Sequence, residues 1–197
     1  MRSRADLYAW LASLVPTERD AAVEKLLGIE ATSSSSPGPH LVGHHMTGVA
    51  AIVRAIHQVP IREDDVVLDL GAGLGKVVAL VNLLTGAKTR GVEVQQELVD
   101  RSNANITHGD ARTCDLSASV IFLYCPFSGA VLDEVSRRLD RLENVVVCAL
   151  GVDLRCTRLR PRPTNDFWMT IWDSGAPRIP IEMPPVAHAI AHEQYDQ

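Results

Sequence analysis

The sequence predicts a single doubly wound α/β domain with a mainly parallel sheet. From Val66 onward, apolar runs of strand length alternate with helical stretches, and the runs lack a polar face. Strands that are apolar on both faces and separated by helices are typical of a parallel sheet covered by helices on each side. The 197 residues are enough for one sizeable core and too few for two ordinary domains.

Composition narrows the class of protein. Hydrophobic residues make up 46% and charged residues 22% of the chain, as in ordinary globular proteins. The net charge of -5 gives no strong nucleic-acid signal, because charge-driven binding depends on clustered Lys and Arg. No apolar run reaches the roughly 20 residues that span a bilayer, and we expect neither a membrane contact nor a signal peptide. Four cysteines without a C-x-x-C pair favour a reduced, cytoplasmic setting.

Residues 1–58 are predicted to form a helical extension within the same domain. One helix is expected over residues 5–15, a second from Pro16 and a third from Thr47, where apolar residues follow at the spacing of one buried face. The Ser-rich segment 32–39 between the last two has the composition of a loop. We interpret it as a candidate lid.

The core, residues 59–197, contains the predicted sheet. Its parallel strands are expected at residues 66–70, 91–94, 120–124 and 145–150, and its helices at 74–84, 95–101 and 130–142. An antiparallel pair is expected near the C-terminus, with strands at 167–172 and 178–182 joined by a turn of sequence Asp-Ser-Gly-Ala-Pro.

A glycine-rich turn follows the first of these strands, in the segment Asp69-Leu-Gly-Ala-Gly-Leu-Gly75. Glycines allow a sharp turn and bring bare backbone close to a ligand beside a helix N-terminus. Dinucleotide-binding enzymes use a similar turn, but here Lys76 stands where their third glycine would be. The carboxylate of Asp69 would repel a pyrophosphate and attract a cation. S-adenosyl-L-methionine, which carries a sulfonium and an ammonium but no phosphate, complements such a site.

Two further acidic residues end or follow strands in the same order along the chain. Glu93 follows Asp69 by 24 positions, and a carboxylate there can accept hydrogen bonds from two ribose hydroxyls. Asp110 comes next and can accept from an adenine amino group. The alternatives are a solvated charge at a helix start for Glu93 and a loop cap for Asp110.

These three ordered matches resemble the class I S-adenosylmethionine-dependent methyltransferase family over about residues 60–150, closest to its small bacterial and lysine-methyltransferase-like branch. The resemblance implies a Rossmann-like fold, with Asp69, Gly71 and Gly73 at the methionine end of the cofactor. The cofactor-binding residues that it implies are Asp69, Gly71, Ala72, Gly73, Glu93, Val94, Asp110, Ala111 and Tyr124. Only 17 positions separate Glu93 from Asp110, fewer than is usual in the family, so either the intervening helix is truncated or residues are missing from the sequence.

The segment Tyr124-Cys-Pro-Phe127 follows the strand at 120–124, where open α/β sheets place their chemistry. It resembles the Asn/Asp-Pro-Pro-aromatic motif of amino-group methyltransferases, but Cys125 replaces the usual amide or carboxylate, which weakens methylation of a base amino group as a specific claim. We predict Tyr124, Pro126 and Phe127 as the catalytic-site residues. The alternative is that they only pack the end of the strand.

Other polar residues carry weaker signals. One of His40, His44 and His45 is a candidate base, although loop histidines are common on surfaces. His188 and His192 have the spacing of a metal pair on a helix, but no third ligand accompanies them, so no metal is expected. The arginines between positions 155 and 162 are interpreted as a solvated strand edge.

The leading hypothesis is S-adenosylmethionine-dependent methyl transfer to an unidentified acceptor. A protein side chain is favoured over a small molecule by the branch that the chain resembles. The alternatives are an NAD-dependent oxidoreductase and a methyltransferase-like protein that binds the cofactor without turnover.

Overall fold

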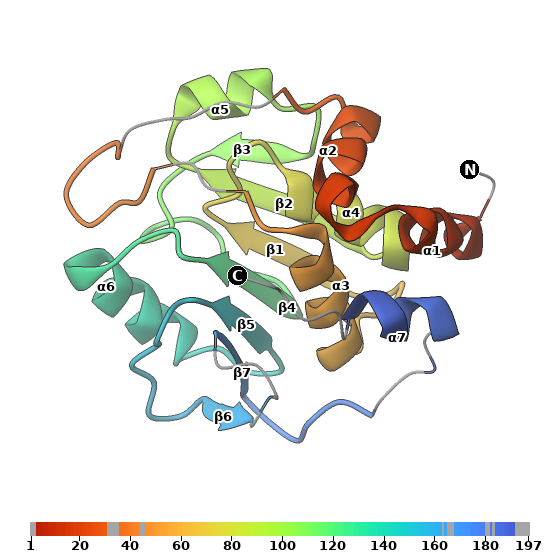
Figure 1. Cartoon of the computed structure of the whole chain (residues 1–197). Helices are drawn as coiled ribbons and strands as arrows, with labels where there is room; N and C mark the ends of the chain where they lie inside the picture. The colour runs from red at the N-terminus through yellow and green to blue at the C-terminus, as the bar shows by residue number, and fades with distance from the viewer. Residues whose placement is uncertain are drawn as a thin grey trace.

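A seven-stranded sheet forms the centre of the computed structural model, which describes residues 3–30, 36–43, 46–162, 164, 168–179, 182 and 184–191. The strands are β1 Val66–Leu70, β2 Lys88–Glu93, β3 Ile106–His108, β4 Val120–Tyr124, β5 Val146–Leu150, β6 Arg160–Arg162 and β7 Met169–Asp173. Their order across the sheet is β3-β2-β1-β4-β5-β7-β6 (Figure 1).

Strand direction confirms the predicted fold class. The strands β1 to β5 pair with one another only in parallel. In contrast, β7 is antiparallel to both of its neighbours, β5 and β6. The sheet is therefore mainly parallel and doubly wound, and its one reversed strand lies between β5 and the edge strand β6.

Helices cover both faces of the sheet (Figure 1). They are α1 Arg4–Ser13, α2 Pro16–Leu27, α3 Val49–Gln58, α4 Lys76–Thr85, α5 Gln96–Arg101, α6 Gly129–Leu139 and α7 Pro185–Ala191. None of those described is long and apolar enough to cross a membrane.

Side chains along each central strand alternate between two hydrophobic clusters. Val67 and Phe122 belong to the cluster that α1, α2, α3, α4 and α7 share with the sheet. Leu68 and Ile121 belong to the second cluster, on the face covered by α6. Since successive residues of a strand point to opposite faces, both faces are buried. The N-terminal helices thus pack into the same core as the strands.

The antiparallel pair differs from the prediction in its second strand. The partner of β7 is β6, which precedes it in the chain, and the strand predicted at 178–182 is wrong for Arg178 and Ile179, which have no regular structure. Pro180 and Ile181 lie outside the described residues. Arg178 instead forms an ion pair with Asp65, which holds this segment at the amino-terminal edge of the sheet.

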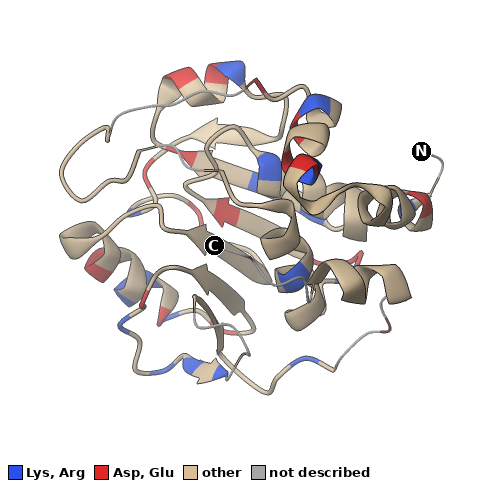
Figure 2. Ribbon diagram, viewed as in Figure 1, with Lys and Arg blue, Asp and Glu red and all other residues tan. Residues whose placement is uncertain are grey.

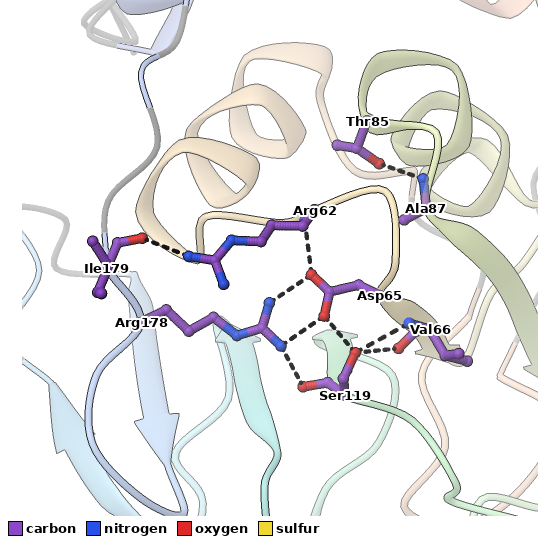
Figure 3. A network of polar contacts seen from close by, with 8 residues as sticks. All are labelled: Arg62, Asp65, Val66, Thr85, Ala87, Ser119, Arg178 and Ile179. Carbon is purple, nitrogen blue, oxygen red and sulfur yellow. Dashed lines mark hydrogen bonds and ion pairs between the residues drawn. The ribbon is translucent and has the colours of Figure 1, made fainter.

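The Asp65 network closes the amino-terminal edge of the sheet (Figure 3). Asp65 precedes β1, and its carboxylate accepts two hydrogen bonds from Arg178, at 2.6 and 2.8 Å, and one from the hydroxyl of Ser119, at 2.6 Å. Burial alone would raise the pKa of Asp65, but these bonds and one from the backbone of Arg62 hold that pKa below its ordinary value. The network lies at the edge opposite to the carboxyl ends of the parallel strands.

Candidate functional site

A cleft opens at the carboxyl ends of β1, β2 and β4, the edge where open α/β sheets bind ligands. The space not filled by protein atoms is about 680 Å³, which includes the solvent at its open mouth. Most of the predicted site residues line it, namely Gly71, Gly73, Glu93, Val94, Asp110, Ala111, Tyr124, Pro126 and Phe127. Asp69 and Ala72 line a small adjoining cavity, which shares Gly71 and Tyr124 with the cleft.

The turn after β1 brings backbone close to the cleft because Gly71 has no side chain. Its φ of +81° lies in the left-handed region, and a Cβ at this position would collide with Pro126. The Gly71 amide donates to the carbonyl of Val92 at 2.9 Å, which fixes the turn against the end of β2. The turn then leads directly into α4.

Glu93 ends β2 with its carboxylate held by two backbone amides. Gly73 N–H donates to Oε2 and Gln95 N–H donates to Oε1, both at 2.9 Å, and the side chain is only 5% exposed. A carboxylate has about four acceptor positions. Two of them therefore stay available to a ligand in the cleft.

Asp69 is the most perturbed acid near the cleft. Its side chain is 4% exposed and makes no hydrogen bond or ion pair within the described parts of the chain. Burial, reinforced by the negative charge of Glu93, raises the pKa of Asp69 to about 7. The two acidic residues lie on the neighbouring parallel strands β1 and β2, whose acidic positions are red in Figure 2. An unpaired buried carboxylate is costly, and a cationic ligand would relieve that cost.

Lys76 connects the start of α4 to the N-terminal extension. Its ammonium contacts Asp20 at 2.5 Å and Glu24 at 2.7 Å, both on α2, and its side chain is 4% exposed. Asp20 also accepts from the first amide of α3, that of Val49, at 2.9 Å. Three helices therefore meet, beside the glycine turn, at an ion-pair cluster in which the lysine is buried and the carboxylates are partly exposed.

The turn at 110–114 forms the wall of the cleft beyond β3. Asp110 is bound by its neighbour Arg112, whose guanidinium and backbone amide both donate to the carboxylate. The side-chain hydrogen bonds from Arg112 hold the pKa of Asp110 below its ordinary value. The short interval before this turn is explained by α5, which has only six residues; the helix is truncated.

The segment after β4 carries the predicted catalytic-site residues. Burial, with smaller contributions from Cys125 and Asp20, raises the pKa of the Tyr124 phenol, which is therefore neutral at physiological pH. Cys125 has a φ of +42°, and its thiol donates to the carbonyls of Leu150 and Gly151 at 3.5 and 3.3 Å. The thiol is thus engaged with the end of β5.

The loop before α3 closes over this segment. Leu41 pairs with Phe127 in an antiparallel bridge, Val42 N–H donates to the Pro126 carbonyl at 3.1 Å, and Ser128 N–H donates to the His40 carbonyl at 2.8 Å. Leu41, Val42 and Gly43 thereby line the cleft.

Only some of the histidines considered as a base or as metal ligands have a described position. The His40 ring packs against Gly129 at the start of α6, away from the cleft lining, whereas His44 and His45 lie outside the described residues. His192 does too, so the predicted absence of a metal pair with His188 stays a prediction. Among the residues with defined positions, no group of three His, Cys, Asp or Glu side chains could hold a metal ion.

Sequence reasoning missed three contributors to the site. The first is the loop at 41–43, the second is Arg112, and the third is the pairing of Lys76 with α2. The i, i+4 spacing of Asp20 and Glu24 placed both carboxylates on one helix face, but nothing in the sequence indicated that this face meets Lys76.

Comparisons with known proteins agree with the topology. No family model matches the sequence, and no curated protein matches it significantly. Among solved structures, an RNA methyltransferase from Salinibacter ruber in complex with S-adenosyl-L-homocysteine is 22% identical, with 70% of this chain and 100% of that chain covered and a TM-score of 0.55.

Two other solved structures are more distant. A precorrin-6y C5,15-methyltransferase from Geobacter metallireducens is 20% identical over 55% of this chain and 65% of its own, with a TM-score of 0.42. A dimethyladenosine transferase from Plasmodium falciparum is 14% identical over 55% of this chain and 43% of its own, with a TM-score of 0.43. At these TM-scores neither structure supports a statement about this protein.

The protein therefore has the fold of class I S-adenosylmethionine-dependent methyltransferases. The strand order and the likeness to the Salinibacter structure both support this statement. The dinucleotide-binding fold has the order 3-2-1-4-5-6, from which this sheet differs by the reversed β7 between β5 and β6.

Proposed function

We propose that this protein binds S-adenosyl-L-methionine in the cleft at the carboxyl edge of the sheet and transfers its methyl group to an acceptor. The observation that carries the proposal is the buried carboxylate of Asp69 beside the glycine turn, which has no partner among the residues that the structure describes. A site with this electrostatic character suits a ligand that carries positive charge and no phosphate.

The other residues of the site fit the remaining parts of that cofactor. The two available acceptor positions of Glu93 match the two hydroxyls of a ribose. Asp69, Gly71 and Gly73 border the place of the methionine end, and the turn that contains Asp110 and Ala111 borders the place of the adenine. These assignments make the cleft a complete cofactor site.

Tyr124, Pro126 and Phe127 form the proposed reaction side of the cleft. When bound, the cofactor supplies a methyl group on a positively charged sulfur, already activated for displacement. The contribution of the protein is then to align a desolvated nucleophile. Pro126 and Phe127 give a rigid wall, held by the loop at 41–43, and the neutral Tyr124 phenol can donate a hydrogen bond to the acceptor.

For the acceptor, we propose a protein side chain, because the sequence resembles the lysine-methyltransferase-like branch of the family. The similar protein from Salinibacter ruber is an RNA methyltransferase, so RNA is the competing acceptor. The net charge of -5 favours the protein over the RNA, because phosphate contacts depend on clustered cations.

Transfer of a labelled methyl group tests the proposed activity. Purified protein is incubated with S-adenosylmethionine, tritiated on the methyl group, and a cell lysate, and precipitated label is counted after protease or ribonuclease digestion. We expect label that protease releases and ribonuclease does not, and a rate at least about tenfold lower for Glu93→Ala. Cofactor binding without methyl transfer to any lysate fraction would favour the alternative of a methyltransferase-like protein that binds the cofactor without turnover.

A further inference from the structure

The carboxylate of Asp110 is largely engaged within the chain. Oδ1 accepts from Arg112 N–H and Nε at 2.8 and 3.0 Å, and Oδ2 accepts from Nε and Nη2 at 3.0 and 2.5 Å. Nε has a single hydrogen, which the two oxygens share, so these four contacts come from three N–H groups and leave about one acceptor position of the carboxylate. An adenine amino group that binds Asp110 would have to use that position, beside the Arg112 guanidinium.

Arg112 itself lies at the cleft. It belongs to the residues that line the cavity, and its side chain is 50% exposed, compared with 32% for Asp110. A guanidinium is planar and stacks on flat ring systems, and it donates hydrogen bonds in a fixed fork. Held by Asp110 on one edge, the Arg112 guanidinium keeps a face and further N–H groups for a ligand.

The turn that carries this pair is braced from the far side by α6. Arg138 donates to the carbonyls of Ala111 and Cys114, both at 2.6 Å. Because the backbone on both sides of Arg112 is fixed in this way, the guanidinium starts from a defined position at the cavity wall. Such preorganisation lowers the entropy cost of binding.

We propose that Arg112 is the residue that contacts the adenine of the cofactor, and that Asp110 is a positioning residue that holds the guanidinium in place. The proposal rests on the proposed function of the cleft and replaces the direct contact expected between Asp110 and the adenine amino group. It makes recognition depend on the flat face of the base more than on its amino group.

Titration of S-adenosylhomocysteine into four purified variants distinguishes the two arrangements. We expect Arg112→Ala to weaken binding about tenfold, Arg112→Lys to recover only part of the loss, Asp110→Ala to lose a similar amount, and the double variant to be no worse than Arg112→Ala. If Asp110 contacts the base directly, Arg112→Ala binds as well as the wild type or better, and the proposal is overturned. Arg137→Ala, a surface arginine on α6 paired with Glu134, is the matched control.

A ligand with an altered base provides a second readout. S-inosylhomocysteine carries an oxygen in place of the adenine amino group. We expect the wild-type protein to bind it within about fivefold of S-adenosylhomocysteine, whereas a direct carboxylate contact would cost it more than about thirtyfold, since the Asp110 carboxylate would face a carbonyl oxygen in place of a donor. Wild-type protein that binds neither ligand would overturn the proposed function itself, and this inference with it.

Discussion

At the residue scale, Asp69 shows most clearly how the site departs from a stability optimum. A buried carboxylate with no partner inside the described chain destabilises the fold, and it persists near the end of a central strand. Such residues are common where a ligand completes the electrostatics. The sequence indicated the acid and its position near the end of β1, but not its burial or its raised pKa, since both depend on the neighbouring strands and on Glu93.

Replacing Asp69 by asparagine should stabilise the protein most at alkaline pH. The pKa of Asp69 in the folded state, about 7, lies above its unfolded value of about 4. The wild-type protein therefore loses stability as pH rises from about 4 to 7, and the loss is complete above about pH 7. We expect the gain in unfolding free energy for Asp69→Asn to be about 1–3 kcal/mol larger at pH 8 than at pH 5. Urea unfolding at both pH values measures it; an equal gain at both would mean that Asp69 is not perturbed.

Glu93 gives the matching prediction for binding. Glu93→Ala removes both acceptor oxygens from the cleft and leaves the amides of Gly73 and Gln95 without their partner. We expect the affinity for S-adenosylhomocysteine to fall by about 1–3 kcal/mol, measured by calorimetry. Glu97→Ala, on the exposed side of α5, should bind like the wild type. Unchanged affinity in Glu93→Ala would remove Glu93 from the ribose site.

At the element scale, the ion-pair cluster joins α2 to the start of α4, next to the glycine turn. Glu24→Gln keeps the shape of the side chain but leaves the ammonium of Lys76 with Asp20 alone. Breaking a buried pair is strongly destabilising, and we expect a loss of about 1–3 kcal/mol in unfolding free energy, because Glu24 is partly exposed. Glu18→Gln, in the first turn of the same helix, is the control. Equal denaturation midpoints for the two variants would show that the cluster contributes little.

The elements that sequence reasoning predicted are those with a strong apolar pattern. The strands β1, β4 and β5 could be predicted because each has an apolar run. The strand β2 was predicted only at its buried carboxyl end, because its first three residues, Lys-Thr-Arg, are polar. In contrast, β3 and β6 are three residues each, and the sequence of β6 is Arg-Pro-Arg. Short polar strands of this kind form because a neighbouring strand offers a free edge, and Pro and Arg at an edge limit further pairing. Tertiary context of this kind leaves no local pattern.

At the scale of the whole molecule, the two edges of the sheet have different roles. Loops at the carboxyl edge build the cleft, whereas the Asp65 network at the amino edge attaches the segment after β7 to β1 and β4 (Figure 3). Arg178→Met should therefore lower the unfolding free energy by about 1–3 kcal/mol and leave the affinity for S-adenosylhomocysteine unchanged. Because the folded pKa of Asp65 is lowered, the wild-type advantage should be present above about pH 4 and fade as pH falls below it. If Arg178→Met had the same unfolding free energy as the wild type at pH 7, the stabilising role of the Asp65 network would be contradicted.

The central claim, that the cleft binds S-adenosylmethionine, is tested most directly by calorimetric titration of the wild-type protein with S-adenosylhomocysteine and, in parallel, with NAD. We expect saturable binding of S-adenosylhomocysteine with a stoichiometry of one and no binding of NAD at the same concentrations, because Asp69 would repel a pyrophosphate. Binding of NAD in preference to S-adenosylhomocysteine would contradict the claim.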